Sequence, residues 1–298
     1  MIKQPPYLKK GDKVGISSPA KKLTTDLSKA ISILEHWGLK VVLGNHVYAA
    51  HHQFAGTDEQ RREDLQNFLD DSEIKAIFAS RGGYGTIRIL DDLDFQNFQQ
   101  QPKWVVGFSD ITILLSHILT QTNTQSVHGQ MPKTFENGTE ESLESLRKAL
   151  FGEALTYVYD SEFENRPGSA TGTLIGGNLT LLIAAEGSGS AFDYTDKILF
   201  IEDVGEHEYA IDRMMRTLKR SGKLAKLKGL IVAAFNGYEI EELPFGQSPE
   251  QIIKEIVKDY DFPVCYNFPS GHIDGNMAMT IGNSVNMEVE RKKVILKQ

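Results

Sequence analysis

The sequence has one cysteine, no long apolar run and no secretion signal, and each shortage excludes a class of protein. Because Cys265 has no second cysteine to pair with, an internal disulfide framework is excluded, which agrees with a reducing compartment. No apolar run approaches the roughly 18 residues of a membrane-spanning helix. Residues 1–6 lack the apolar segment and cleavage site of a signal peptide. We therefore expect a cytoplasmic protein with no membrane partner, in which Cys265 is a buried, inert thiol.

Positive charge is also in short supply. The 298 residues include 32 Lys and Arg against 40 Asp and Glu, which gives a formal net charge of −8. No cluster of Lys and Arg resembles a stripe that follows a phosphate backbone, so we expect no nucleic-acid partner. The remaining composition, 40% hydrophobic and 24% charged, is that of an ordinary globular protein with one large or two medium domains.

Motifs for nucleotides and metals are absent or incomplete. No phosphate-binding Gly-x-x-x-x-Gly-Lys-Ser/Thr segment occurs. Gly83-Tyr84-Gly85 begins like a dinucleotide-binding turn, but Arg88 stands where the third glycine belongs and no acidic residue follows at the expected distance. His51 and His52 have no Cys, His or carboxylate at metal-ligand spacing, so we interpret them as loop residues. We expect neither a cofactor nor a metal.

What is present in the first half is a regular alternation of strands and helices. Such alternation predicts a parallel sheet with helices on both faces, and in such sheets the functional sites form at the carboxyl ends of the strands. The expected strands are 13–19, 40–43, 74–79 and a segment ending at Ser109, and the expected helices are 27–34, 57–69, 87–90, 111–120 and 139–150.

The composition and periodicity of the sequence change after residue 151. Residues 152–172 contain Pro167 and several glycines among polar residues and show no period, so we predict a linker there, between domains at 1–151 and 173–298. The second half contains more strands than helices could separate, which predicts a mixed, β-rich domain. Its expected strands are 197–201, 229–235, one around 264, 278–281, 285–289 and 294–296, and its expected helices are 209–221 and 249–258.

Ser109 lies at the corner between a buried strand and a helix. The apolar run ending in Gly107-Phe108 stops at this serine, and helical periodicity begins at Ile111. A serine at such a corner can be a nucleophile, because backbone N–H groups nearby can hold a developing oxyanion. The alternative is a helix N-cap, which serine often provides.

Three other segments supply what such a serine needs. The Gly82-Gly83 turn follows the preceding strand, and its backbone could approach a reacting carbonyl closely. Glu202 ends an apolar strand, so its carboxylate could be partly buried and would then need a partner. His272 lies in a glycine-flanked loop. The order Ser, Glu, His also occurs in α/β-hydrolases, but Ile111 replaces the last glycine of their Gly-x-Ser-x-Gly elbow.

In these segments the chain resembles the LD-carboxypeptidases, the serine peptidase family S66. The family includes muramoyltetrapeptide carboxypeptidases and microcin C self-immunity peptidases. One departure is the segment 277–282, where the family commonly has a Pro-Leu-Gly ending. The segments that carry the resemblance are Arg81–Gly85, Gly107–Asp110, Glu202–Asp203 with Tyr209 and Asp212–Arg213, and Gly271–His272 with Asn276, supported by Gly176–Asn178.

The resemblance implies a role for each site residue. Ser109 would be the nucleophile, His272 the general base and acid, and Glu202 the group that orients His272. The backbone N–H groups of Gly83 and Asp110 would form the oxyanion hole. It also implies an N-terminal Rossmann- or flavodoxin-like domain and a smaller β-rich C-terminal domain with the site between them, no metal, and a homodimer.

The implied activity is release of terminal D-alanine from a murein tetrapeptide in cell-wall recycling. Arg81 is a candidate for binding the substrate's carboxylate by its charge alone, and a structural arginine is the alternative. A second possibility keeps the chemistry but takes a peptidyl-nucleotide of the microcin C type. The third is a ligand-binding α/β module without catalysis.

Overall fold

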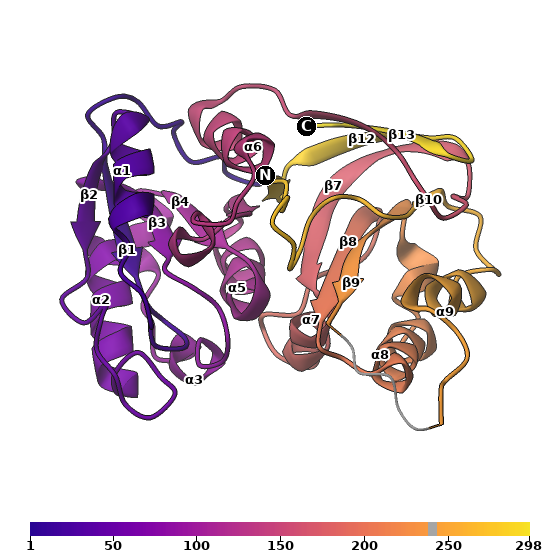
Figure 1. The fold of residues 1–298 in the computed structure, drawn as a ribbon, viewed down its shortest axis with the longest axis horizontal. Helices are drawn as coiled ribbons and strands as arrows, with labels where there is room; N and C mark the ends of the chain where they lie inside the picture. Colours follow the sequence, from indigo (N-terminus) through magenta and orange to yellow (C-terminus); the bar gives the residue numbers. More distant parts are fainter. Residues whose placement is uncertain (238–242) are drawn as a thin grey trace.

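The computed structural model describes residues 1–237 and 243–298, which form two sheets lying side by side (Figure 1). The first sheet has the strand order β11-β5-β4-β3-β1-β2, in which β1 to β5 are parallel and β11 is antiparallel to β5. Its strands are β1 (Lys13–Ser17), β2 (Lys40–Leu43), β3 (Ile74–Ala79), β4 (Trp104–Gly107), β5 (Ser126–His128) and β11 (Met279–Ile281).

Helices cover both faces of the first sheet. All four residues of β4 are buried, as expected for a central strand of a parallel sheet. Alternate residues face opposite sides of the sheet. Trp104 packs with the core under α1 and α6, and Val105 packs with the core under α2 to α5. Thr57 starts α2 with a capping box to Gln60, as the sequence predicts. The helices are α1 (Ser28–His36), α2 (Asp58–Asp70), α3 (Ile87–Leu90), α4 (Gln96–Gln100), α5 (Thr112–Thr122) and α6 (Glu140–Phe151), with short 3-10 helices η1 (Ser109–Ile111) and η2 (Pro132–Thr134).

The second sheet has the order β10-β9-β8-β7-β12-β13-β6. Its first four strands are parallel and the other three are antiparallel to their neighbours, so the sheet is mixed. The strands are β6 (Thr156–Asp160), β7 (Gly168–Asn178), β8 (Lys197–Val204), β9 (Gly229–Asn236), β10 (Val264–Cys265), β12 (Ser284–Val289) and β13 (Lys293–Lys297), and the helices are α7 (Leu179–Ala185), α8 (Glu208–Arg220), η3 (Leu224–Lys226) and α9 (Pro249–Ile256).

The predicted fold class is confirmed, while several elements differ from the sequence prediction. Residues 152–172, expected to be a linker, contain β6 and the start of β7. The glycines and Pro167 suggested a loop there, although Thr156–Asp160 contains the strand-favouring residues Tyr157, Val158 and Tyr159, and the edge strand β6 was missed. The short strand β5 and helix α7 were not predicted either. Cys265 is buried, as expected, and burial raises the pKa of its thiol to about 12.

The two halves contact each other where α5 and η1 pack against β7 and α7, with β11 of the first sheet also beside β7 (Figure 1). The Asn178 backbone N–H donates to Thr112 Oγ1 at 3.1 Å. Gly177 has φ 140°, and a Cβ there would lie 2.7 Å from Thr112 Oγ1, so only glycine allows this close approach. The contact places the carboxyl end of β4 beside that of β8. Among the helices of residues 1–237 and 243–298, none is both long and apolar enough to cross a membrane.

Candidate active site

Ser109 occupies a sharp corner after β4. Its φ is 63°, in the left-handed region that non-glycine residues rarely adopt, and it opens the 3-10 turn that leads into α5. Its side chain caps neither η1 nor α5, so the N-cap alternative is wrong. A Cβ on Gly107 would lie 2.6 Å from Ile111 Cγ2, so glycine is needed for the helix to start this close to the strand. Strain of this kind is found at functional sites, where the surrounding structure maintains it.

The glycine turn after β3 packs directly against Ser109. A Cβ on Gly82 would lie 2.8 Å from Ser109 Cβ, 3.0 Å from its Oγ and 3.4 Å from the Asp110 backbone nitrogen. Gly83 has φ 116°, again in the region that favours glycine. In the hydrogen bonds between residues that the structure describes, neither the Gly83 nor the Asp110 N–H is a donor. Both groups are therefore available to a bound oxyanion.

Buried side chains hold this turn in place. The Asp110 carboxylate accepts the Thr86 backbone N–H at 2.8 Å, and burial raises the pKa of Asp110. Arg61 is also buried and donates through Nη1 to the carbonyl oxygens of Pro19 and Gly85, at 2.5 and 2.9 Å. The turn is thus tied both to the Ser109 corner and to the loop after β1.

Arg81 makes backbone contacts in this structure. Its Nε donates to Gly82 O at 3.3 Å and its Nη1 to Lys22 O at 3.1 Å. These bonds join the turn to the loop after β1, which is what the structural alternative expects. Among the described residues it has no carboxylate partner, so its role toward a substrate stays a prediction.

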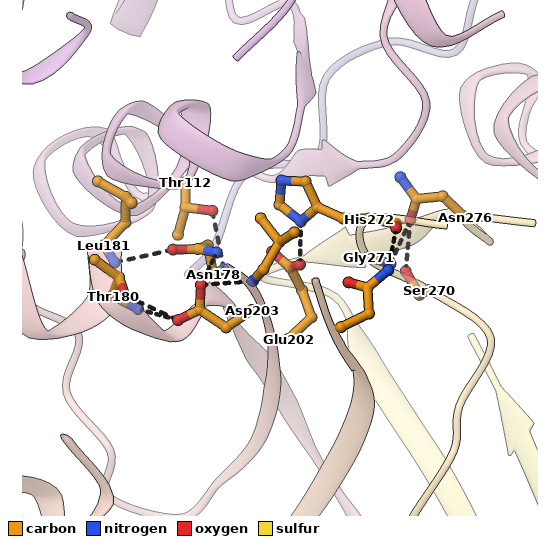
Figure 2. A network of polar contacts seen from close by, with 12 residues as sticks. Thr112, Asn178, Thr180, Leu181, Glu202, Asp203, Ser270, Gly271, His272 and Asn276 are labelled. Atoms are coloured by element: carbon orange, nitrogen blue, oxygen red, sulfur yellow. Dashed lines mark hydrogen bonds and ion pairs between the residues drawn. The ribbon is translucent and has the colours of Figure 1, made fainter. Parts of the chain in front are cut away.

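Glu202 and His272 come together although 70 residues separate them. His272 Nδ1 lies 2.7 Å from Glu202 Oε2, with Glu202 fully buried and the His272 side chain 20% exposed (Figure 2). The strand β8 continues past Glu202 to Val204, so the carboxylate lies within the strand and not at its end as predicted, and it has the histidine partner that burial requires. The His272 ring also packs edge-on against Phe108, the residue before Ser109, with ring centroids 4.9 Å apart.

The loop that carries His272 is fixed by one amide side chain. Asn276 Oδ1 accepts from the Gly271 backbone N–H and from Ser270 Oγ, both at 2.8 Å (Figure 2). Gly271 has φ 110°, and a Cβ there would lie 2.9 Å from Glu202 Oε2. The backbone before His272 therefore passes directly against the carboxylate that holds its ring.

Asp203 follows Glu202 but has different partners. Its carboxylate accepts from Asn178 Nδ2 at 2.8 Å and from the backbone N–H and hydroxyl of Thr180, both at 2.9 Å (Figure 2). Burial, followed by the adjacent Glu202 charge, raises the pKa of Asp203 to about 6. This carboxylate ties β8 to the start of α7, a structural task that its place in the sequence does not reveal.

The structure thus brings together most of the residues that the sequence singles out. Glu202 and His272 are hydrogen-bonded, and the Gly82-Gly83 turn touches Ser109. Ser109 Oγ and His272 are not hydrogen-bonded in this structure; the His272 ring instead contacts Phe108, the residue before Ser109. Catalytic hydrogen bonds often tighten only when substrate binds. Within residues 1–237 and 243–298, no three His, Cys, Asp or Glu side chains cluster in a way that could hold a metal.

Comparison with known families and proteins matches both halves of the chain. Residues 14–129 match the model of the LD-carboxypeptidase N-terminal domain. Residues 171–287 match the model of the LD-carboxypeptidase C-terminal domain. A curated relative from Bacillus subtilis, named a probable murein peptide carboxypeptidase, is 35% identical over 98% of this chain and 94% of its own length. A Pseudomonas aeruginosa protein, named murein tetrapeptide carboxypeptidase, is 32% identical over 94% of both chains.

Solved structures show the same arrangement of elements. A muramoyltetrapeptide carboxypeptidase from Oxalobacter formigenes superposes with a TM-score of 0.87 at 28% identity, covering 96% of this chain and 98% of that one. A microcin C7 self-immunity protein superposes with a TM-score of 0.88 at 21% identity, covering 99% and 98%. At that identity, the second match shows a shared fold alone.

Proposed function

The chain belongs to the LD-carboxypeptidase family and is a serine-type carboxypeptidase, and from that premise we propose that it releases terminal D-alanine from murein tetrapeptide during cell-wall recycling. The bond cleaved joins an L-configured centre to the D-alanine. The observation that carries the proposal is the buried Glu202–His272 pair, whose imidazole packs against the residue before Ser109.

In the proposed mechanism, Ser109 Oγ attacks the carbonyl carbon of the bond to D-alanine while His272 Nε2 takes its proton. Glu202 Oε2 accepts the Nδ1–H of His272, which keeps Nε2 free as a base and stabilises the imidazolium that forms. The carbonyl oxygen becomes an oxyanion that the N–H groups of Gly83 and Asp110 stabilise.

Collapse of the tetrahedral intermediate breaks the C–N bond. His272 gives the proton to the leaving amine, D-alanine departs, and the shortened peptide remains as an ester on Ser109. A water molecule then attacks the ester with His272 again acting as base, and the proton returns to Ser109 Oγ. The two half-reactions together consume one water and regenerate the enzyme.

The direct test is release of D-alanine from a purified muramoyl tetrapeptide and from the free tetrapeptide. We expect Ser109→Ala to lower kcat by at least about a thousandfold, since removing the nucleophile of a serine peptidase leaves only binding and oxyanion stabilisation. Ser72→Ala makes the same chemical change at an exposed position outside the site and is the control. Undiminished release by Ser109→Ala would exclude the proposed nucleophile.

A peptidyl-nucleotide substrate of the microcin C type is the second candidate, because self-immunity proteins share the fold. Neither tryptophan is placed to stack a nucleotide base at the candidate site: Trp104 is buried, and Trp37 packs against Phe135. Hydrolysis of tetrapeptide without hydrolysis of processed microcin would decide between the two substrates. Failure of a fluorophosphonate probe to label Ser109 would instead support a non-catalytic binding module.

We further propose that the protein is cytoplasmic and that it forms a homodimer, the latter because the family resemblance implies it. Light scattering on the purified protein measures the oligomeric state, and cell fractionation measures the location. A monomer in solution would remove the dimer from the proposal without affecting the mechanism, because every proposed catalytic group comes from one chain.

A further inference from the structure

His128 is a fully buried histidine that the mechanism above does not use. It ends β5, pairs in register with Gly107 of β4, and lies between the rings of Phe108 and Phe200, with centroids 5.8 and 4.8 Å away. Neither ring nitrogen has a hydrogen-bond partner among the residues that the structure describes. Buried polar groups without partners are uncommon in folded proteins, so each one calls for an explanation.

The two side chains that fix His272 and its loop each have a buried polar atom that also lacks a partner. They are Glu202 Oε1 and Asn276 Nδ2, again considering only residues 1–237 and 243–298. Each belongs to a side chain whose other polar atom already holds the base: Glu202 Oε2 contacts His272 Nδ1, and Asn276 Oδ1 accepts from the Gly271 N–H. The two side chains that hold His272 and its loop therefore each keep one buried polar atom without a partner among the described residues.

Three side chains lie close enough to His128 to alter its titration. Burial lowers the pKa of His128 to about 4, while the nearby Glu202 carboxylate opposes this, His272 reinforces it, and the Asn276 amide also opposes it. His128 is therefore neutral at neutral pH. A neutral imidazole has one N–H donor and one acceptor nitrogen. Among the side chains that alter its titration, the unpartnered atoms are one acceptor, Glu202 Oε1, and one donor, Asn276 Nδ2, which is the complementary set.

We propose that His128 is a positioning residue, whose neutral ring donates to Glu202 Oε1 and accepts from Asn276 Nδ2, directly or through one buried water. These bonds fix both oxygens of Glu202, so the carboxylate cannot rotate away from His272. They also connect β5, next to the nucleophile strand, with the loop that carries His272. In metal sites, removing the partner behind a ligating histidine or carboxylate typically costs about 10 to 100-fold in affinity or activity, and we expect an effect of the same order for this carboxylate. The proposal rests on the assignment of Glu202 and His272 above.

The test compares His128→Phe, which removes both hydrogen-bonding nitrogens, with His128→Gln, whose amide keeps one donor and one acceptor. For His128→Phe we expect kcat for D-alanine release to fall about 10 to 100-fold with KM within about twofold. Fluorophosphonate labelling of Ser109 should slow by a similar factor, because it needs the base but no murein peptide. His128→Gln should recover most of both losses. His117→Phe, at a histidine on α5 outside the site, is the control.

A spectroscopic measurement on the unmodified protein supports the test if a variant does not fold. In nitrogen-15 spectra of labelled histidine, we expect His128 to keep one neutral tautomer between about pH 5 and 8, and its N–H shift to move in Glu202→Gln. Titration of His128 near its ordinary value of about 6.5, or a mixture of tautomers, would overturn the proposal.

The kinetic results also separate this proposal from the proposed function. Unchanged kcat and labelling in His128→Phe, with D-alanine released by the unmodified protein, would overturn only the role of His128. If His128→Phe and His128→Gln had equal Tm and lost equal amounts of kcat and labelling rate, the proposal that His128 acts by donating and accepting hydrogen bonds would be overturned. If no D-alanine is released but probe labelling follows the expected order of variants, the role of His128 stands and the substrate proposal fails.

Discussion

The two halves of the candidate site hold their groups by different means. In the first half, Ser109 is placed by backbone geometry: it has φ 63° and the Cα of Gly82 packs directly against its side chain. In the second half, Glu202 and His272 are placed by hydrogen bonds between side chains and from Asn276 to the loop backbone. Backbone positioning fails when an atom is added, whereas side-chain positioning fails when a bonding atom is removed.

The difference has a physical basis in what each group must do. A nucleophile has to face backbone N–H groups at a fixed distance, and tight turns containing glycine provide that arrangement. A general base has to keep one tautomer while its charge changes, and only a partner for its second nitrogen provides that. The comparison predicts opposite kinds of damaging substitution in the two halves.

After removal of the nucleophile itself, the largest effect is expected for Glu202→Gln. An amide N–H facing His272 Nδ1 favours the tautomer in which Nε2 carries the proton and cannot act as a base, so we expect kcat to fall by about 10³ to 10⁴-fold. Asp203→Asn is the matched control, since Asp203 lies next in the chain but bonds Asn178 and Thr180 instead. It should lower stability by about 1–3 kcal/mol and change kcat less than tenfold. If kcat of Glu202→Gln lay within tenfold of that of the unmodified enzyme, His272 held by Glu202 would not be the general base.

Gly82→Ala should have the next largest effect. Its φ is not positive, so the substitution tests only the added methyl group, which would lie 2.8 Å from Ser109 Cβ and 3.0 Å from Oγ. Displacement of the nucleophile from the oxyanion donors should lower kcat about 10² to 10³-fold. Gly275→Ala, in the second half, is the control, because the nearest atom to its added methyl group is Thr139 Cγ2, 4.0 Å away. Equal activity of the two variants would contradict backbone positioning of Ser109.

The smallest effect concerns His128, the residue of the first sheet that faces the polar groups of the second half. Its pKa is lowered from 6.5 to about 4 in the folded state. Between these values the unfolded chain binds a proton that the folded chain does not. The contribution of His128 to the free energy of unfolding is therefore fully present above about pH 6.5 and is lost as the pH falls toward 4. Between pH 7 and pH 5, we expect the free energy of unfolding to decrease by about 2 kcal/mol for this reason.

We expect the free energy of unfolding of His128→Gln to decrease less between pH 7 and pH 5 than that of the unmodified protein, as measured by denaturant unfolding at both pH values. The result is taken as the difference from the unmodified protein, because Asp203 acts in the opposite sense. Burial raises the pKa of Asp203 to about 6, so its contribution weakens as the pH rises from about 4 to 6. His36→Gln removes an exposed imidazole and is the control. Parallel pH curves for His128→Gln and the unmodified protein would contradict the buried, neutral state of His128.

Much of the first half could be predicted because its signals are local. The strand Ile74–Ala79 and helix Ile87–Leu90 have the bounds that the sequence indicates, and Ser109 lies at the predicted corner. The segment 279–281 was predicted as a strand, but not as the antiparallel neighbour of β5 in the first sheet. That pairing joins residues about 150 positions apart, and nothing in the local periodicity of either segment specifies it.

The residues of the candidate site also differ in whether local sequence signals indicate them. The sequence was sufficient to select Ser109, Glu202 and His272 as candidates, since each follows an apolar run or lies between glycines at a recognisable corner. It contained no sign of His128, because β5 is only three residues long and has no apolar run before it. Its importance follows from its burial and its neighbours, which are properties of the folded chain.

By itself, the sequence determined where strands, turns and helices begin and which residue types stand at their ends, because φ preferences, caps and periodicity act over a few residues. Only the tertiary structure decided that Glu202 meets His272 across 70 residues, that Asp203 instead bonds Asn178, and that His128 is buried behind them. Electrostatic and hydrogen-bonding energies depend on distance through space and on exclusion of water, and folding sets both.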